Sequence, residues 1–424
     1  MTFAQTAGTM DCPSCAAPIS FDRRFGPWCA ACDWNVDAGA VTPTKLNRVE
    51  RRRAALAKRL AAGSARPLVD ADSDRPPRWG LASTIGLVAS CAVIVAWLLL
   101  VLVGITLVQT GTILVLGGIL ALGIAVASRP RLGSAPEGAI DRANAPALYA
   151  LVDEIAVALK APRVHTIAID GDWNAGTLRF GPLQRTAIVV GLPLWHALSD
   201  PARVAILGHE VAHSVNGDTS RGLIQGTALR TLQTWAEVTE PDDVMSGYDG
   251  FEGLFSIPVN LAMLGLSRFF TFLFNSLQLI LIRPGLRAEF YADRLAASVA
   301  GVPATIDALD RLRLERAYRR AVGAVAIASR PTGELFAELQ TQLELTPPSE
   351  LERARRREAK HPLDRDPSHP PLNERIALLG RRPTSAPPLL AIDPARMRTI
   401  DAELAQVEPR VARDLVEEYL SALS

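Results

Sequence analysis

Hydrophobic residues are strongly segregated along this chain. Residues 79–127 contain no charged side chain and divide near Gln109 into two apolar runs of about 20 or more residues each. A helix of that length can cross the hydrocarbon core of a bilayer. The pattern therefore predicts a transmembrane helical hairpin over residues 79–128.

A third apolar stretch covers residues 254–282 and is interrupted by Pro258 and Arg268. Two crossings need about 40 residues, more than this stretch contains. We expect either a helical pair or re-entrant segment against the membrane, or a buried core helix.

The rest of the chain alternates short amphipathic segments with two segments rich in β-branched residues. Apolar positions spaced for one helix face predict helices, and the β-branched segments predict strands. The expected fold is mainly α with a small β-sheet, an α+β domain over residues 140–380 followed by a helical segment at 381–424. The expected elements are a helix at 145–160, strands at 164–170 and 186–190, two helices within 306–345, a charged loop or helix end at 350–366 and a helix at 396–423.

Basic residues flank the hairpin on both sides. The overall net charge is only +1, but residues 45–78 hold ten Lys or Arg, and Arg129 and Arg131 follow the second apolar run. Basic flanks favour the cytoplasmic side, so both ends of the hairpin are expected there. Residues 41–78 are expected to form a basic helix and linker, which either contacts anionic lipid head groups or is simply solvated.

Four of the five cysteines form two Cys-x-x-Cys pairs near the N-terminus. Cys12 and Cys15 are separated from Cys29 and Cys32 by a spacing typical of a zinc ribbon, in which four thiolates hold a structural zinc. Two disulfides fit a cytoplasmic location poorly, and a rubredoxin-like iron site remains an alternative. We expect a ribbon over residues 1–40 with an unknown partner. No basic and aromatic pattern accompanies it, so no nucleic-acid partner is expected.

A second group of potential metal ligands lies in the sequence His209-Glu210-Val211-Ala212-His213. On a helix, residues four apart share a face, so both imidazoles can reach one zinc ion while Glu210 acts on a water beside it. Ser199-Asp200-Pro201 supplies a helix start before this motif. The alternative is a surface helix with coincidental histidine spacing.

Two histidines leave a zinc ion short of ligands. Glu289 can supply a third, and Asp293, four residues later on the same face, can fix the tautomer of a ligand imidazole. The alternative is an ordinary exposed acidic pair near Arg287 and Arg294.

Together with two further motifs, these residues resemble the HtpX and CAAX prenyl protease family of membrane zinc endopeptidases. The resemblance covers residues 144–300 and 368–376. The four matching pieces, in the family's order, are Asp172-Trp173-Asn174-Ala175-Gly176, Leu207 to Asp218, Glu289 to Asp293, and His369-Pro370-Pro371 with Glu374-Arg375.

The resemblance implies a gluzincin, a zinc peptidase in which a bound zinc activates a water and a glutamate takes its proton. It implies one catalytic zinc beside the structural one. The implied roles are zinc ligation by His209, His213 and Glu289, general base catalysis by Glu210, orientation of a ligand by Asp293, and substrate binding by Asn174 and Ala175.

The role of the late His-Pro-Pro element stays open. His369 or Arg375 could stabilise the oxyanion of the tetrahedral intermediate. Alternatively, Pro370-Pro371 forms a rigid turn and Arg375 a structural ion pair.

The two ligand segments also constrain topology, because residues 254–282 lie between His213 and Glu289. A single crossing by this stretch would place Glu289 on the opposite side of the membrane from the histidines. The expected protein is therefore a multi-pass membrane endopeptidase whose N-terminus and catalytic domain face the cytoplasm. It would cleave peptides or proteins at the bilayer surface, with membrane-protein quality control or peptide processing as its role. The alternative is a membrane scaffold whose ribbon recruits a protein partner.

Overall fold

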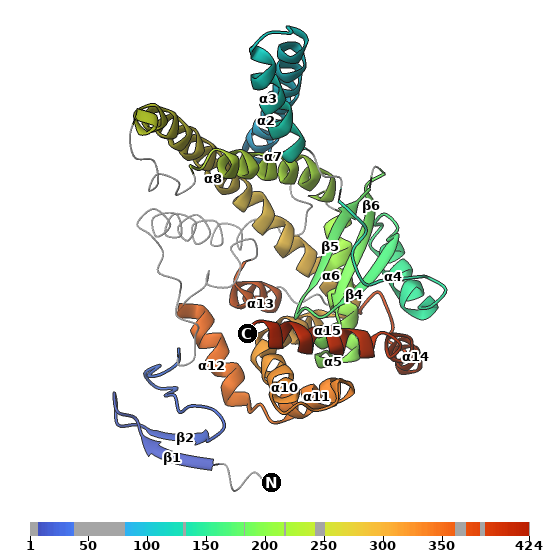
Figure 1. The fold of residues 1–424 in the computed structure, drawn as a ribbon. Helices are drawn as coiled ribbons and strands as arrows, with labels where there is room; N and C mark the ends of the chain where they lie inside the picture. Colours follow the sequence, from blue (N-terminus) through green and yellow to red (C-terminus); the bar gives the residue numbers. More distant parts are fainter. Residues whose placement is uncertain are drawn as a thin grey trace.

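The fold is described here from a computed structural model. It covers residues 7–37, 81–129, 133–181, 183–215, 218–241, 251–360, 370–381 and 386–423. The chain is mostly helical with two small sheets, which confirms the expected fold class (Figure 1). The helices are α2 Leu81–Gln109, α3 Leu114–Ala127, α4 Pro146–Ala158, α5 Leu192–Ala197, α6 Asp200–Val215, α7 Asp218–Val238, α8 Phe251–Ala300, α9 Val302–Arg311, α10 Glu315–Ile327, α11 Leu335–Glu344, α12 Pro348–Lys360, α13 Leu372–Arg381, α14 Pro394–Leu404 and α15 Glu408–Ser421.

The larger sheet has four strands in the order β3-β4-β6-β5. Strands β4 and β6 are parallel, whereas β3 and β5 pair antiparallel with their neighbours. Strand β5 therefore lies at an edge, next to helix α6 (Figure 1). The strands are β3 Ala139–Ile140, β4 Thr166–Asp170, β5 Ala175–Phe180 and β6 Arg185–Gly191.

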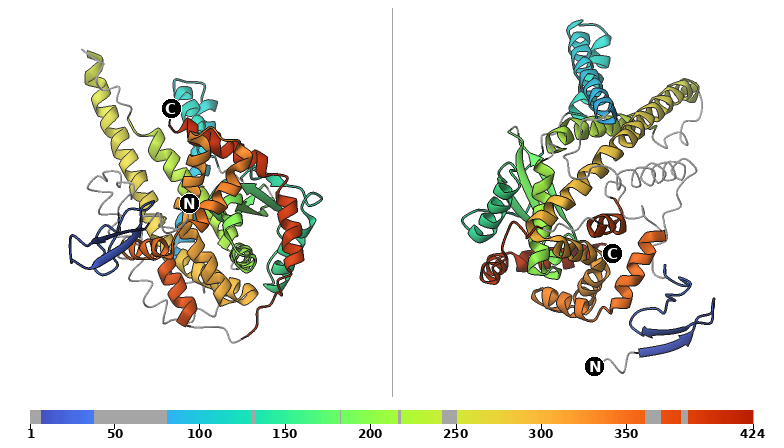
Figure 2. Two further views of the ribbon diagram at one scale, coloured as in Figure 1. Left: turned by 90° about the horizontal axis from the view of Figure 1, so that it is seen from below. Right: turned by 180° about the vertical axis from the view of Figure 1, so that it is seen from behind.

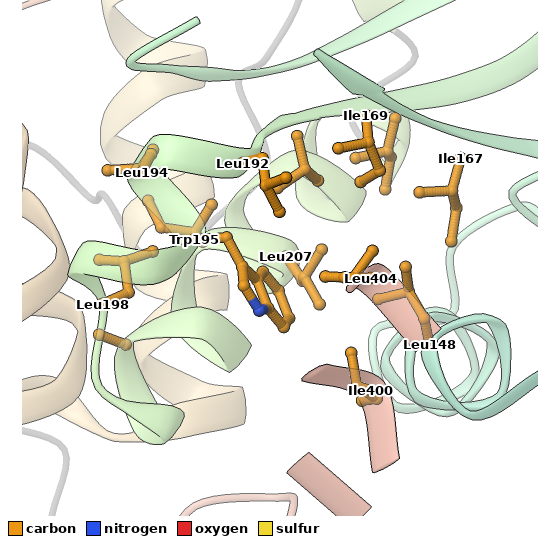
Figure 3. Packing of buried hydrophobic residues seen from close by; sticks show 14 of the residues in the cluster. Leu148, Ile167, Ile169, Leu192, Leu194, Trp195, Leu198, Leu207, Ile400 and Leu404 are labelled. Atoms are coloured by element: carbon orange, nitrogen blue, oxygen red, sulfur yellow. The ribbon is translucent and has the colours of Figure 1, made fainter. Parts of the chain in front are cut away.

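Helix α6 is enclosed by the main hydrophobic core. Almost all of its residues are buried, and Leu207 packs into a cluster that includes Trp195 and Leu148 (Figure 3). Leu404 and Ile400 of α14 reach the same cluster from the C-terminal part of the chain. Polar side chains on so enclosed a helix must find partners inside the protein.

Helices α2 and α3 form the expected hairpin and project from the rest of the molecule (Figure 1). The turn between them contains Gly111 in the left-handed region, at φ 64°. Close packing requires glycine at Gly118, since a Cβ there would lie 2.8 Å from the carbonyl oxygen of Gly104. The arms are unequal: α2 has 29 residues, and α3 has 14 rather than the expected 20 or so. At 1.5 Å per residue they are about 43 Å and 21 Å long.

The third apolar stretch, residues 254–282, is a single helix, so the expectations of a helical pair and of a buried core helix are wrong, whereas its association with a membrane stays a prediction. It lies within the single 50-residue helix α8. Helix α7 packs alongside α8 and leads the chain away from α6, and α8 brings the chain back to α6. Side chains such as Leu261, Phe269 and Phe272 are exposed. Two described helices are long and apolar enough to cross a membrane, at Ser83–Gln109 and Asn260–Ala300.

The cysteine-rich segment contains a hairpin of β1, Ala7–Asp11, and β2, Pro18–Asp22. It contacts helix α12, which belongs to the region expected as a charged loop or helix end (Figure 2). Arg353 of α12 is only 3% exposed. Its guanidinium donates to the carbonyl oxygens of Val36 at 3.1 Å, Gly26 at 2.9 Å and Asn35 at 2.7 Å.

Neighbouring side chains extend this contact. Arg356 bonds the carbonyl of Ala30 and pairs with Asp33 at 3.0 Å, and Lys360 lies 3.7 Å from the same carboxylate. The Arg320 guanidinium lies over the ring of Phe25, 4.8 Å from its centroid. The cysteine-rich segment is therefore docked on the helical domain by a buried arginine and a rim of exposed charges.

Replacing Arg353 by Ala should loosen this docking, because three ribbon carbonyls would lose a charged donor in a buried contact. We expect a weakening on the order of 3 kcal/mol. Hydrogen–deuterium exchange should become faster in residues 7–37 and 348–360. The control, Lys360→Ala, removes only an exposed ion pair and should change little. Unchanged protection in Arg353→Ala would contradict the account.

Candidate metal centre

Helix α6 presents the two motif histidines to one point. It begins at Asp200 and ends at Val215, so His209 and His213 lie one turn apart well inside it. Their Nε2 atoms are 3.2 Å apart. His209 is buried and His213 is half-buried, so the alternative of an exposed helix with coincidental histidine spacing is excluded for this part of the chain.

Helix α8 brings Glu289 to the same point. Its Oε2 lies 3.5 Å from Nε2 of His209 and its Oε1 lies 3.5 Å from Nε2 of His213. Glu289 is 6% exposed and Asp293 is 2% exposed, so the alternative of an exposed acidic pair is wrong. Gly208 of α6 faces Ala296 of α8, and a Cβ at position 208 would be in ordinary van der Waals contact, 3.4 Å from Cα of Ala296.

The potential ligand atoms of the three residues lie close to the spacing that a zinc ion requires. Zinc binds nitrogen and oxygen at 2.0–2.1 Å in tetrahedral sites, which places neighbouring ligand atoms about 3.3–3.4 Å apart. The two Nε2 atoms are 3.2 Å apart, and each lies 3.5 Å from a different carboxylate oxygen of Glu289, which is close to that value. Three protein ligands leave a fourth position for water or substrate, which is the arrangement of a catalytic site.

Asp293 and Arg375 lie next to His209. Oδ1 of Asp293 is 3.1 Å from Nδ1 of His209, so the imidazole can donate from Nδ1 and keep Nε2 for a metal. Arg375 of α13 donates to both oxygens of Asp293, from Nε at 2.8 Å and Nη2 at 2.6 Å. The geometry therefore favours the ion-pair alternative for Arg375. His369, the other oxyanion candidate, lies outside the described residues.

Burial lowers the pKa of His209, but hydrogen bonds with Asp293 and Glu289 outweigh it and raise the pKa to about 10. In the metal-free protein, His209 therefore holds a proton at neutral pH. A metal ion must displace this proton, so metal binding should tighten as the pH rises.

Glu210 is buried beside the ligands and contacts strand β5. Its Oε2 lies 3.0 Å from the hydroxyl oxygen of Thr177, and its carbonyl oxygen lies 2.8 Å from the same hydroxyl. Thr177 belongs to none of the motifs recognised in the sequence. The two-residue periodicity of the strand could have indicated it, because Thr177 lies on the same face as Ala175.

The two strand residues predicted to bind substrate lie at the start of β5. The side chain of Asn174 is exposed, and its carbonyl accepts a hydrogen bond from the amide of Gly191 at 2.8 Å. Ala175 is the first residue of the strand and pairs with Val190 of β6. Their role in binding substrate stays a prediction.

The four N-terminal cysteines form a second cluster. Sγ of Cys12 lies 3.6 Å from Sγ of Cys32, and Sγ of Cys15 lies 3.7 Å from Sγ of Cys29. These thiols are free, and their spacing matches the edge of about 3.8 Å expected around zinc bound at 2.3 Å. The cluster fits a structural metal with no open position; a structural zinc there stays a prediction, and iron the alternative.

A helix carrying His-Glu-x-x-His that faces a carboxylate on a second helix is the arrangement of zinc peptidases. Comparison with known proteins agrees, since the model of peptidase family M48 matches residues 142–382. The chain belongs to this family, which confirms the resemblance drawn from the sequence.

One curated relative is a "Protease HtpX homolog" of Bacillus pumilus (strain SAFR-032). It is 29% identical over 193 residues, which make up 42% of this chain. The chain spans only 58% of the length of that relative. No solved structure matches the chain.

The two clusters predict a zinc content of two ions per chain, and Glu289→Ala should reduce it to one. The variant removes one of three ligands from the α6–α8 site and leaves the cysteine cluster intact. The matched control is His196→Ala, which removes a histidine bonded to Glu408 outside both clusters. Elemental analysis that finds equal zinc in wild type and Glu289→Ala would contradict the assignment.

Proposed function

We propose that the protein is a zinc-dependent endopeptidase that acts at the cytosolic face of a membrane. The observation that carries the proposal is the convergence of two histidines of α6 with Glu289 of α8: the Nε2 atoms are 3.2 Å apart, and each lies 3.5 Å from one oxygen of Glu289. Glu210 lies next to one ligand and is buried with it. The membership of the chain in peptidase family M48 supports the same activity.

Each residue around the site has a distinct task in this proposal. A zinc ion bound by His209, His213 and Glu289 would polarise the peptide carbonyl and activate water. Glu210 would accept the proton of the attacking water and pass it to the leaving amine. Asp293 would hold the His209 ring in the tautomer that ligates, and Arg375 would keep Asp293 ionised and in place.

The peptide substrate would lie along strand β5. This strand pairs with β6 on one side and forms the edge of the described sheet on the other. An extended peptide can add to such an edge through main-chain hydrogen bonds, whatever its side chains are. Substrates at the membrane surface are proposed because two long apolar helices, α2 and α8, belong to the same chain.

Three observations support the proposed topology. The ribbon precedes the hairpin and α12 follows it, and Arg353 of α12 bonds the ribbon directly, which supports a hairpin with both ends on one side. The basic residues of segment 45–78 and Arg129 favour the cytoplasm for that side. The free thiols of the ribbon agree with a reducing compartment.

Replacing Glu210 by Gln should abolish cleavage of an unfolded substrate such as casein while the protein keeps two zinc ions. The amide cannot accept a proton, and loss of a general base costs about 10²–10⁴-fold in rate. The matched control is Glu237→Gln, the same change on α7, where the side chain of Glu237 accepts a hydrogen bond from Gln233 at 2.9 Å. A strong chelator should inactivate the wild type, and added zinc should restore it. Cleavage by Glu210→Gln at the wild-type rate would refute the proposed mechanism.

A reporter fused after Ser424 should report a cytosolic location in cells. The expectation follows from the basic flanks of the hairpin and from the docking of the ribbon on α12. Two reporter enzymes are fused in parallel, one that is active only in the cytosol and one that is active only outside it, and their activities are compared. Activity of the external reporter alone would overturn the orientation.

A further inference from the structure

We propose that Thr177 is a positioning residue for the general base, Glu210, and that it couples the substrate-binding strand to the proton transfer. The inference rests on the proposed function and assigns a role to a residue outside the family's motifs. It starts from one hydroxyl on edge strand β5 that lies within hydrogen-bond distance of two oxygens of Glu210.

The hydroxyl has two acceptors and one proton. Oγ1 of Thr177 is 2.8 Å from the carbonyl oxygen of Glu210 and 3.0 Å from its Oε2. It can donate to only one of them at a time. An ionised carboxylate is the stronger acceptor, so the proton should point to Oε2 when Glu210 is ready to act as base.

This bond restricts the side chain that must meet the attacking water. A free glutamate has three rotatable bonds, and fixing them has an entropic cost that a pre-formed contact removes from the reaction itself. With Oε2 held by Thr177, Oε1 is the oxygen that makes no hydrogen bond within the described part of the chain. Thr177 thereby selects which carboxylate oxygen is available for the water.

The position of Thr177 is set by the sheet. It pairs with Ile188 in the antiparallel register of β5 and β6, and the core buries Ile188 completely. A peptide that adds to the free edge of β5 would take its register from the same strand. The strand that would align the scissile bond is thus the strand that holds the base.

A purely structural role is the competing explanation. The bond to the carbonyl of Glu210 could serve only to hold β5 against α6. A structural tie would be reflected in thermal stability, zinc content or KM. If Thr177 instead positions the base, removing its hydroxyl lowers kcat, because Glu210 is then misoriented in the complex that already holds substrate and metal.

The test compares Thr177→Val and Thr177→Ala, which lack the hydroxyl, with Thr177→Ser, which keeps it. Full-length protein in detergent is assayed for kcat and KM on a fluorogenic peptide, for zinc content and for the melting temperature. Thr186→Val is the matched control, the same change on neighbouring strand β6. We expect Thr177→Val and Thr177→Ala to lower kcat by about 10- to 100-fold, with KM within about twofold of the wild-type value and two zinc ions retained. Ser should retain kcat within about threefold.

Three outcomes would overturn the inference: unchanged kcat in Val and Ala, an equal loss in Ser, or a loss explained by zinc content or melting temperature. The failure of the proposed function is a different result. In that case the wild type itself would not cleave, or Glu210→Gln would cleave as fast as the wild type.

Discussion

Everything in the candidate site depends on the close contact between helices α6 and α8. At this contact Gly208 of α6 faces Ala296 of α8. The contact encloses His209, Glu210 and Glu289. Burying ionisable groups together costs several kcal/mol each unless they neutralise one another or bind a cation. The enclosed charges are therefore a strong physical reason for a metal at this crossing.

The same contact determines the shape of the rest of the chain. Helix α8 carries Glu289 near its C-terminal end, so its apolar N-terminal part extends far from the site, and α7 must lead the chain out to meet it. On the other side, the charge of Asp293 requires a partner, which Arg375 of α13 supplies. Helix α13 is tied to α12 through Asn373, whose side chain donates to the carbonyl of Arg355 at 2.9 Å. The ribbon then docks on α12, so a continuous set of contacts leads from the cysteine cluster to the α6–α8 crossing.

The local parts of this arrangement could be predicted from the sequence. Helical periodicity alone places His209 and His213 on one face, and the two Cys-x-x-Cys pairs indicate a four-thiolate cluster. The pairing of Glu289 with Asp293 follows from the same spacing rule. Each of these motifs consists of residues that are close in the sequence. They can therefore be recognised without knowing which distant segments contact them.

The parts that depend on distant contacts could not be predicted. Helix α7 was missed because Gln225, Arg230 and Gln233 interrupt its apolar pattern, so the packing of α7 against α8 could not be foreseen. Arg353 looked like one charge in a solvated run, yet the ribbon more than 300 residues away buries it. The sequence around Thr177 indicates this residue only through the two-residue alternation of a strand.

The most direct test of the α6–α8 metal centre is X-ray absorption at the zinc edge on the purified wild-type protein. The account predicts two populations of equal size, one with sulfur ligands at about 2.3 Å and one with nitrogen and oxygen ligands at about 2.0–2.1 Å. A spectrum that contains the sulfur shell alone would mean that the crossing of α6 and α8 holds no zinc, and would contradict the central claim.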